Sequence, residues 1–320
     1  MHMISADDVA RSLPWERLVD RLEITFRQGV EAPPRHHHTM HRADGDATML
    51  LMPAWEEDGY IGMKMVNVFP QNASAGLPAI AGVYLLCEGR HGRPLACMDG
   101  SELTRRRTAA ASALASRLLS RKQASTLLMV GTGRLAPMLI EAHAAVRPIS
   151  RVQIWGRQPA KAEALADHYR DRFDCEVVED LESATSTADI ISCATLSTES
   201  LIRGDWLSPG AHLDLVGAFR PDMRETDGRC FQRSAVFVDT YAGALGEAGD
   251  LLQAVHEGAF ETDSIRADLA QLINKTRTGR ENDQQITLFK SVGASLEDLA
   301  AAIEVWNTIH SSTQAREERP

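Results

Sequence analysis

The spacing of apolar residues divides the chain into two parts with different patterns. From about Thr126 onward, short apolar bursts such as TLLMV, RVQIW, ADIISCAT and AHLDLVGA alternate with longer helical stretches such as RQPAKAEALADHYRDRF. Buried strands that alternate with helices are typical of a parallel sheet with helices on its faces. We therefore predict that residues 123–291 form an α/β domain around a parallel sheet.

The residues before this region predict a different architecture. Within residues 1–122, the stretches YIGMKMVNVF and AIAGVYLLCEGRHGRPLACMD read as strands, and EGRHGRP suits a hairpin turn. This pattern indicates an α+β domain with antiparallel strands. Near the C-terminus, SVGASLEDLAAAIEVWNTIHSS predicts a long amphipathic helix with one apolar face, formed by Leu296, Leu299, Ile303 and Trp306. We expect residues 292–320 to pack back onto the first part, so that both chain ends build this second domain.

The composition is that of a globular protein with two domains. The chain has 320 residues, of which 44% are hydrophobic and 24% charged, and this length exceeds what one compact core usually serves. No apolar run approaches the ~20 residues that cross a bilayer. The N-terminal sequence MHMISADDVARSLPWERLVD lacks the basic start and apolar block of a signal peptide. We therefore expect a cytoplasmic protein without a membrane partner.

Cysteine usage and net charge narrow the possible ligands. The five cysteines are spread along the chain without a C-x-x-C pair, so neither a disulfide framework nor a zinc site is indicated. The formal net charge of −10, with no long basic stripe, argues against nucleic acid as a partner. A small molecule is the expected ligand.

A glycine-rich turn follows the first predicted strand of the parallel sheet. Gly131, Gly133 and Ala136 form G-x-G-x-x-A between a strand signal and a helix signal, which is the context of the dinucleotide fingerprint. Gly131 permits the tight turn, Gly133 lets the backbone approach the pyrophosphate, and Ala136 keeps the helix close to the strand. The α/β domain is therefore predicted to be a Rossmann-type, doubly wound domain, with Thr132, Arg134 and Thr195 also contacting the cofactor.

The end of the second predicted strand indicates which cofactor is preferred. NAD-preferring sites usually place an acidic residue there for the ribose hydroxyls, about 20 residues after the glycines. Here RVQIW is followed by Gly156, Arg157 and Gln158. Arg157 can pair with a 2′-phosphate, so we expect NADP(H) to be preferred, with NAD(H) possible. The alternative is that Arg157 is a solvated loop cation.

Three basic residues outside this domain are candidates for binding a substrate. Arg107 falls in the apolar stripe of a helix predicted in DGSELTRRRTAAASALASRLL and capped by Ser101. A guanidinium there needs an anionic partner, either a substrate carboxylate or an internal salt bridge. Lys64 lies in YIGMKMVNVFP, which has apolar residues on both faces, so we expect a strand covered on both sides and a lysine that is paired or has a shifted pKa. Arg35 by itself reads as a surface loop arginine.

Two further groups of polar residues have less specific patterns. The run His36, His37 and His38, with His41, invites a metal interpretation, but no second ligand cluster stands out and the flanking prolines indicate a loop. We predict no metal. Glu247 and Asp250 in GALGEAGDLL are candidate functional carboxylates, or charges that favour a helix N-terminus.

The ordered motifs together resemble one known family. Arg35, Lys64, LTRRRTAAASALA, MVGTGRLA, VGAFRPDMRE, EAGDLL and TLFKSVGASLEDLAAA resemble the ornithine cyclodeaminase and mu-crystallin family, in this order and over nearly the whole chain. The resemblance implies a Rossmann nucleotide domain and a second domain that carries the interface of a homodimer. It also implies that Arg35, Lys64 and Arg107 converge on the α-carboxylate of the substrate, beside the nicotinamide.

One position bears on the reaction. The deaminases of this family carry an aspartate in a glycine-rich segment after a late Rossmann strand, and aligning VGAFRPDMRE on it places Phe219 there. Phenylalanine cannot take a proton, so cyclising deamination loses its candidate base. Phe219 suits an apolar wall of the substrate pocket, or simple packing. We predict NADPH-dependent reduction of a small cyclic imino acid, such as 1-pyrroline-2-carboxylate to L-proline. The alternatives are NAD-dependent ornithine cyclodeamination, an alanine or opine-type dehydrogenase, and a non-catalytic NADPH-binding protein.

Overall fold

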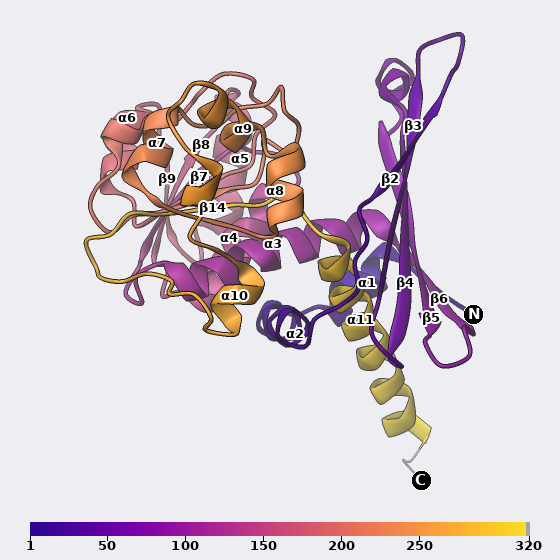
Figure 1. The fold of residues 1–320 in the computed structure, drawn as a ribbon. Helices are drawn as coiled ribbons and strands as arrows, with labels where there is room; N and C mark the ends of the chain where they lie inside the picture. The colour runs from indigo at the N-terminus through magenta and orange to yellow at the C-terminus, as the bar shows by residue number, and fades with distance from the viewer. Residues whose placement is uncertain (318–320) are drawn as a thin grey trace. The chain divides into compact units, whose positions relative to one another are not determined.

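The computed structural model describes residues 1–317 of the chain. It divides into two compact units, one made of residues 1–108 and the chain from Ala294 onward, the other of residues 109–293 (Figure 1). The first division falls inside helix α3 (Gly100–Leu119), ahead of the boundary expected after residue 122. The last residues of the expected segment 292–320 lie outside the described part.

The first unit is built on a mixed six-stranded sheet. Its strands are β1 (His2–Ile4), β2 (His36–Met40), β3 (Ala47–Trp55), β4 (Tyr60–Val68), β5 (Ile80–Glu88) and β6 (Pro94–Asp99). They lie in the order β1-β6-β5-β4-β3-β2. β1 is parallel to β6, and every other pairing is antiparallel, as the hairpin pattern of this region predicts.

Helices cover one face of this sheet. They are α1 (Ala6–Ser12), α2 (Trp15–Gln28) and α11 (Ser295–Glu317), and a short 3-10 helix, η1 (Pro70–Ala75), connects β4 to β5. α11 packs on β3, β4 and β5 and on α2, with Leu296, Leu299 and Ile303 buried. The start of α3 differs from the expectation. Asp99 accepts the backbone N–H of Glu102, so the cap is Asp99, not Ser101, because the helix begins two residues earlier than a Ser101 cap requires.

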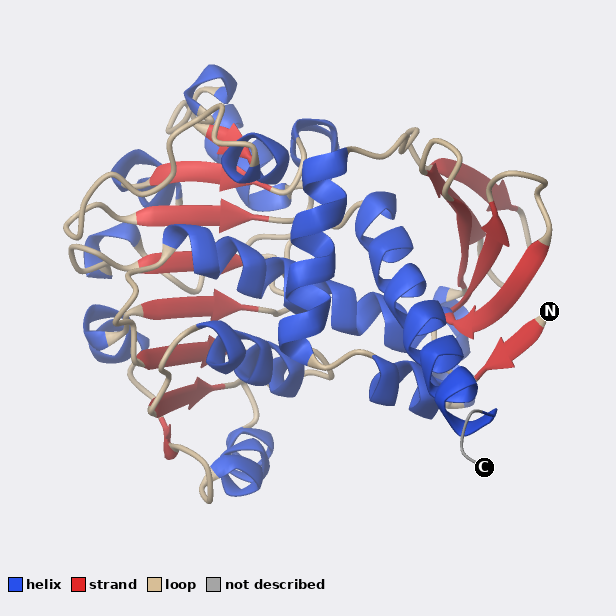
Figure 2. Cartoon of the chain, turned by 90° about the horizontal axis from the view of Figure 1, so that it is seen from below, coloured by secondary structure: helices blue, strands red, loops and turns tan. Residues whose placement is uncertain are grey.

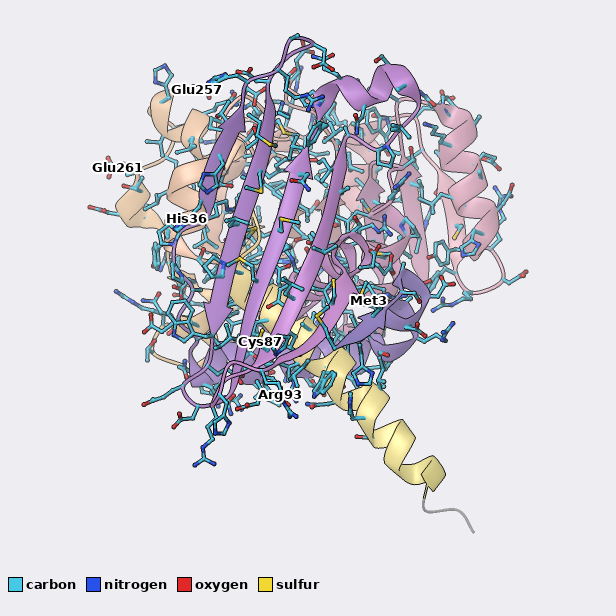
Figure 3. All side chains as sticks on the ribbon, turned by 90° about the vertical axis from the view of Figure 1, so that its right-hand side faces the viewer. Met3, His36, Cys87, Arg93, Glu257 and Glu261 are labelled. Atoms are coloured by element: carbon cyan, nitrogen blue, oxygen red, sulfur yellow. The ribbon has the colours of Figure 1, made fainter. Side chains whose placement is uncertain are left out.

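The opposite face of this sheet carries no helix among the residues that the structure describes (Figure 3). Strand register places a set of apolar side chains there, and its exposed members are Met3, Trp55, Ile61 and Leu85. Met63 and Met65 are half-buried on the same face. The expectation that the Lys64 strand is covered on both sides is therefore wrong for the single chain over residues 1–317, because the helices of this part pack on the Lys64 face alone.

The second unit contains an eight-stranded parallel sheet (Figure 2). The strands are β7 (Thr126–Val130), β8 (Arg151–Trp155), β9 (Asp174–Val177), β10 (Ile190–Cys193), β11 (His212–Leu215), β12 (Ala235–Val238), β13 (Ala267–Asp268) and β14 (Thr287–Lys290). Their order is β13-β12-β14-β11-β10-β7-β8-β9. The chain runs outward from β7 to β9 and then returns to β10 on the other side of β7. This reversal confirms the doubly wound, Rossmann-type fold.

Helices flank this sheet and close its core. Apart from α3 they are α4 (Ala136–Val146), α5 (Pro159–Tyr169), α6 (Leu181–Thr187), α7 (Gly228–Arg233), α8 (Tyr241–Glu247), α9 (Gly249–His256) and α10 (Leu269–Ile273), with the 3-10 helices η2 (Gly204–Trp206) and η3 (Thr262–Ser264). Every residue of β10, β11, β12 and β14 is buried. Continuous burial is expected of strands covered on both faces. No helix of the described chain is long and apolar enough to span a membrane.

Candidate active site

The glycine-rich turn lies between β7 and α4, as the fingerprint requires. Gly131 has φ of 120°, and a Cβ placed there would lie 2.6 Å from the carbonyl oxygen of Ala194, so only glycine fits. A Cβ on Gly133 would meet no atom within 4 Å, which leaves open space beside the backbone. Ala136 is buried at the start of α4. This turn therefore has the close packing and the open side that a bound pyrophosphate needs.

The neighbouring strand ends complete a cradle for a dinucleotide. Strand order reverses between β7 and β10, and ligands of open α/β sheets bind at the carboxyl ends of the strands at such a point. A Cβ on Gly156, after β8, would lie 2.7 Å from the side chain of Thr132, so the turns after β7 and β8 touch. Arg134 and Arg157 are exposed. These residues fit a nicotinamide dinucleotide, which when bound supplies hydride chemistry.

A buried carboxylate that sequence reasoning missed supports Thr195. Glu225 accepts hydrogen bonds from the Thr195 backbone N–H and hydroxyl and from the Gly217 N–H. Asp250 accepts from the backbone N–H of Glu225, and the Lys290 Nζ lies 3.3 Å from its Oδ2. Asp250, one of the two candidate carboxylates in GALGEAGDLL, therefore belongs to a buried hydrogen-bond and ion-pair network with Glu225 and Lys290. Only its contact partners, which come from distant segments, reveal this.

Phe219 lies in the loop after β11 and its side chain is 38% exposed. Its backbone N–H donates to the carbonyl of Gly217. A phenyl ring at this exposure is available to contact a ligand and holds no proton to exchange.

Lys64 and Arg107 form a buried ion cluster in the first unit. The Lys64 Nζ lies 2.7 Å from Asp298 Oδ2. Arg107 Nε donates to Asp298 Oδ1 at 2.8 Å, and Arg107 Nη1 donates to Glu297 Oε2 at 2.7 Å. Lys64 and Arg107 are 2% and 4% exposed, and both carboxylates are fully buried. Arg107, in the apolar stripe of α3, therefore meets two carboxylates in the first turn of α11. The internal salt bridge that was one of its two predicted partners is present.

The cluster perturbs the proton affinity of its members. Burial lowers the pKa of Lys64 to about 8 against the opposing charge of Asp298, and the positive charges of Arg107 and Arg35 add to this lowering. Burial alone would raise the pKa of Asp298, but Arg107 and Lys64 hold it below its usual value. Burial works against the charge of Arg107, yet Asp298 and Glu297 raise its pKa. Arg107 is thus a permanent cation, whereas Lys64 exchanges its proton close to neutral pH.

Arg35 belongs to the same electrostatic neighbourhood. It lies half-buried in the loop before β2, and its charge acts on Lys64. The charges of a loop residue and of a helix residue, Arg35 and Arg107, thus both act on the Lys64 ammonium group of β4. Glu297 and Asp298 were missed because two acidic residues in a helix's first turn usually read as dipole-stabilising surface charges.

The histidine run does not form a loop. His36, His37 and His38 form edge strand β2 and are all exposed, and successive side chains in a strand point to opposite faces. The strand pairs with β3 in spite of the preceding prolines because these precede its first residue. Within the described residues, no group of three or more potential ligands could hold a metal ion.

Comparison with known proteins shows which family the chain belongs to. The sequence model of the ornithine cyclodeaminase/mu-crystallin family matches residues 1–313. The chain belongs to this family. It is 41% identical to the protein SAR DEFICIENT 4 of Arabidopsis thaliana over 290 residues, 87% of each chain. It is 37% identical to a Delta(1)-pyrroline-2-carboxylate reductase of Colwellia psychrerythraea over 311 residues, 95% of this chain and 98% of the relative.

A solved structure is similar in fold to this chain over nearly its whole length. The Delta(1)-pyrroline-2-carboxylate reductase of Thermococcus litoralis, in complex with NADH and L-proline, matches with a TM-score of 0.91 at 29% identity, over 98% of each chain. With the dinucleotide fingerprint in place, the chain is assigned to the NAD(P)-dependent oxidoreductases of its family.

Proposed function

We propose that this enzyme reduces a small cyclic imino acid, such as 1-pyrroline-2-carboxylate, to the corresponding amino acid with NADPH. The observation that carries the proposal is the buried Lys64–Arg107 cluster, together with the names of the relatives. Such a substrate combines a carboxylate with a C=N bond that, once protonated, accepts hydride. The enzyme then needs to bind the carboxylate, exclude water and supply one proton to the imine nitrogen.

Arg107 and Lys64 are proposed to bind the substrate carboxylate. Asp298 and Glu297 hold both cations in fixed positions, so little side-chain order is lost when an anion binds. Arg107 keeps its charge at every relevant pH. Lys64, whose pKa is about 8, can also donate a proton to the imine nitrogen of the substrate. Arg35 adds positive charge near Lys64.

Phe219 favours the reductase over the deaminase. A cyclodeaminase must remove protons from an amine and its attacking group, whereas an iminium is already electrophilic. The exposed phenyl ring after β11 can line the apolar part of the substrate and cannot act as a base. Three alternatives remain, and the assay described below distinguishes them from the reductase. They are ornithine cyclodeamination, alanine or opine-type dehydrogenation, and NADPH binding without turnover.

We also propose a preference for NADP(H) over NAD(H). The loop after β8 offers Arg157 and no carboxylate between Trp155 and Gln158, and the exposed Arg157 side chain can pair with a 2′-phosphate. Replacing Arg157 with Ser should lower the ratio of kcat/KM for NADPH to that for NADH about tenfold, the size of one lost charged contact. An unchanged ratio would assign Arg157 to the solvent.

The exposed apolar face of the six-stranded sheet supports a homodimer. A contiguous apolar surface of this kind marks an interaction site in a protein otherwise covered by polar groups. We propose that a second copy covers Trp55, Ile61 and Leu85. The variant Ile61→Arg should then elute as a monomer in size-exclusion chromatography with light-scattering detection, where the parent chain elutes as a dimer.

The decisive assay is the initial rate of NADPH absorbance loss with 1-pyrroline-2-carboxylate near neutral pH. A rate that scales with enzyme concentration supports the reductase. Ammonia release from L-ornithine without net nicotinamide change would identify the deaminase, and nicotinamide reduction by L-alanine would identify a dehydrogenase. Tight NADPH binding with no turnover on any of these compounds would leave only a binding protein.

A further inference from the structure

We propose that Glu225 positions the nicotinamide half of the cofactor site, because its carboxylate links the loop after β10 to the loop after β11. The inference rests on the proposed function only in requiring a nicotinamide cofactor, and not on the identity of the substrate.

The geometry places one carboxylate between two loops. Glu225 is fully buried. Its Oε1 accepts from the Thr195 N–H at 2.6 Å and the Thr195 hydroxyl at 2.8 Å, and its Oε2 accepts from the Gly217 N–H at 2.8 Å. Thr195 comes two residues after β10 ends, and Gly217 comes two residues after β11 ends. Each carboxylate oxygen therefore holds one loop.

The two loops approach each other closely beside the Glu225 carboxylate. A Cβ on Gly217 would lie 2.2 Å from the Thr195 carbonyl oxygen and 2.3 Å from Glu225 Oε1. The Thr195 side also meets the fingerprint, because a Cβ on Gly131 would lie 3.3 Å from Thr195 Cγ2. A shift of the Thr195 backbone would therefore displace both the glycine-rich turn and the loop that leads to Phe219.

Topology indicates which half of the cofactor these loops serve. A dinucleotide lies across the point where strand order reverses, with its adenosine on the side of the second strand, where the ribose-binding residue follows that strand. Here the second strand is β8, so the adenosine side is that of Arg157. The loops after β10 and β11 lie on the other side of β7, which is the nicotinamide side.

Glu225 acts through its partners and does not touch the ligand. Its carboxylate is fully buried and accepts from three protein donors, two of which are backbone N–H groups that cannot accept a proton in return. If Glu225 is protonated, one of its two carboxyl oxygens becomes a hydroxyl and is a poorer acceptor for these N–H groups. The tie between the loops thus depends on the negative charge of Glu225.

Charged and titratable groups surround this carboxylate on several elements. Asp250 faces it from α9, Lys290 from the end of β14 and Cys193 from β10. Burial and the negative charge of Asp250 raise the pKa of Glu225 to about 7, while Lys290 and the hydrogen bonds from Thr195 oppose the rise. The carboxylate therefore takes up a proton when the pH falls below neutrality, and the tie should weaken in that direction.

The test measures binding and not turnover. We would compare the Kd of NADH, by fluorescence titration between pH 6 and pH 8.5, for the parent enzyme and Glu225→Gln. NADH is chosen because the 2′-phosphate of NADPH itself titrates close to this range. At pH 8, Glu225→Gln should raise the Kd of NADH about tenfold, as expected for one lost charge-assisted contact, and leave the Kd of ADP within a factor of about two. The Kd of NADH should rise for the parent enzyme as the pH falls below 7, and this dependence should be absent in the variant.

Matched variants separate positioning from a general loss of structure. Glu163→Gln removes an exposed carboxylate on α5 of the same unit and should bind NADH like the parent. Glu225→Asp should recover part of the lost affinity. If Glu225→Gln does not fold, Thr195→Val, which removes one donor to the same carboxylate, should weaken NADH binding severalfold with ADP binding unchanged.

Two results would overturn the inference. Equal weakening of NADH and ADP would show a domain-wide effect, and an unchanged Kd of NADH in Glu225→Gln or in Thr195→Val would show that the tie is irrelevant to the cofactor. Failure of the proposed function looks different, because NADH would bind normally while 1-pyrroline-2-carboxylate gave no rate.

Discussion

Asp298 offers a direct test of the ion cluster, because its carboxylate touches both proposed anion-binding cations. Its two oxygens lie 2.7 Å from the Lys64 Nζ and 2.8 Å from the Arg107 Nε. The perturbation is Asp298→Asn, which keeps the shape of the side chain and removes its charge. Arg107 keeps its second partner, Glu297, so Lys64 is the group that loses its counter-ion.

The expected loss of stability follows from burial. Removing one partner of a buried ion pair costs about 3–5 kcal/mol, because the remaining charge stays desolvated. Asparagine can still accept one hydrogen bond, so we expect the lower end, about 3 kcal/mol. For a domain of this size each kcal/mol shifts the melting temperature by about 2–4 °C, so Tm should fall by about 6–12 °C at pH 7.

The pH dependence distinguishes this reasoning from a packing defect. Burial has already lowered the pKa of Lys64 to about 8, and without Asp298 it falls further. Between these two pKa values the parent protein binds more protons than the variant, so the stability difference shrinks as the pH rises. The Tm difference should therefore be smaller at about pH 9.5 than at about pH 7, since neutral Lys64 needs no counter-ion.

The assay is thermal unfolding at both pH values, with Glu57→Gln in an exposed turn as the matched control. The double variant Lys64→Met with Asp298→Asn should lose less than the sum of the single variants. A Tm for Asp298→Asn within about 1 °C of the parent, or an equal drop at both pH values, would refute the reasoning.

Three more predictions test the site. Arg107→Ala should lower kcat/KM for 1-pyrroline-2-carboxylate about 30-fold or more, which corresponds to about 2 kcal/mol of lost transition-state binding, and unchanged steady-state kinetics would make Arg107 purely structural. The affinity for pyrrole-2-carboxylate, an unreactive planar carboxylate, should weaken as the pH rises through about 8 and Lys64 loses its charge, and a flat inhibition profile from pH 7 to pH 9.5 would contradict this. Gly131→Ala should abolish NADPH binding in a titration, because its Cβ would lie 2.6 Å from the Ala194 carbonyl at a φ of 120°, and normal binding would mean that the turn tolerates a shift of β10.

The sequence could predict the features that depend on local order. The strand, glycine turn and helix from Thr126 to Val146 are consecutive in the chain, and the glycines are required by backbone geometry. Alternation of apolar bursts with helical stretches likewise predicted the parallel sheet, because a fully buried strand must be apolar on both faces. The isolated charges of Lys64 and Arg107 in apolar patterns marked them as enclosed, because a charge on a buried face needs a partner.

The partners of those charges were decided by tertiary structure. Asp298 and Glu297 lie about 190 residues from Arg107 along the chain, and no local pattern distinguishes them from ordinary first-turn acids. The same holds for Glu225, whose partners follow two different strands. The histidine run also became an edge strand through pairing with β3. Sequence by itself determined which residues must be buried, turned or charged, and the folded chain decided which of them meet, because the free energy of a buried charge depends on neighbours from distant segments.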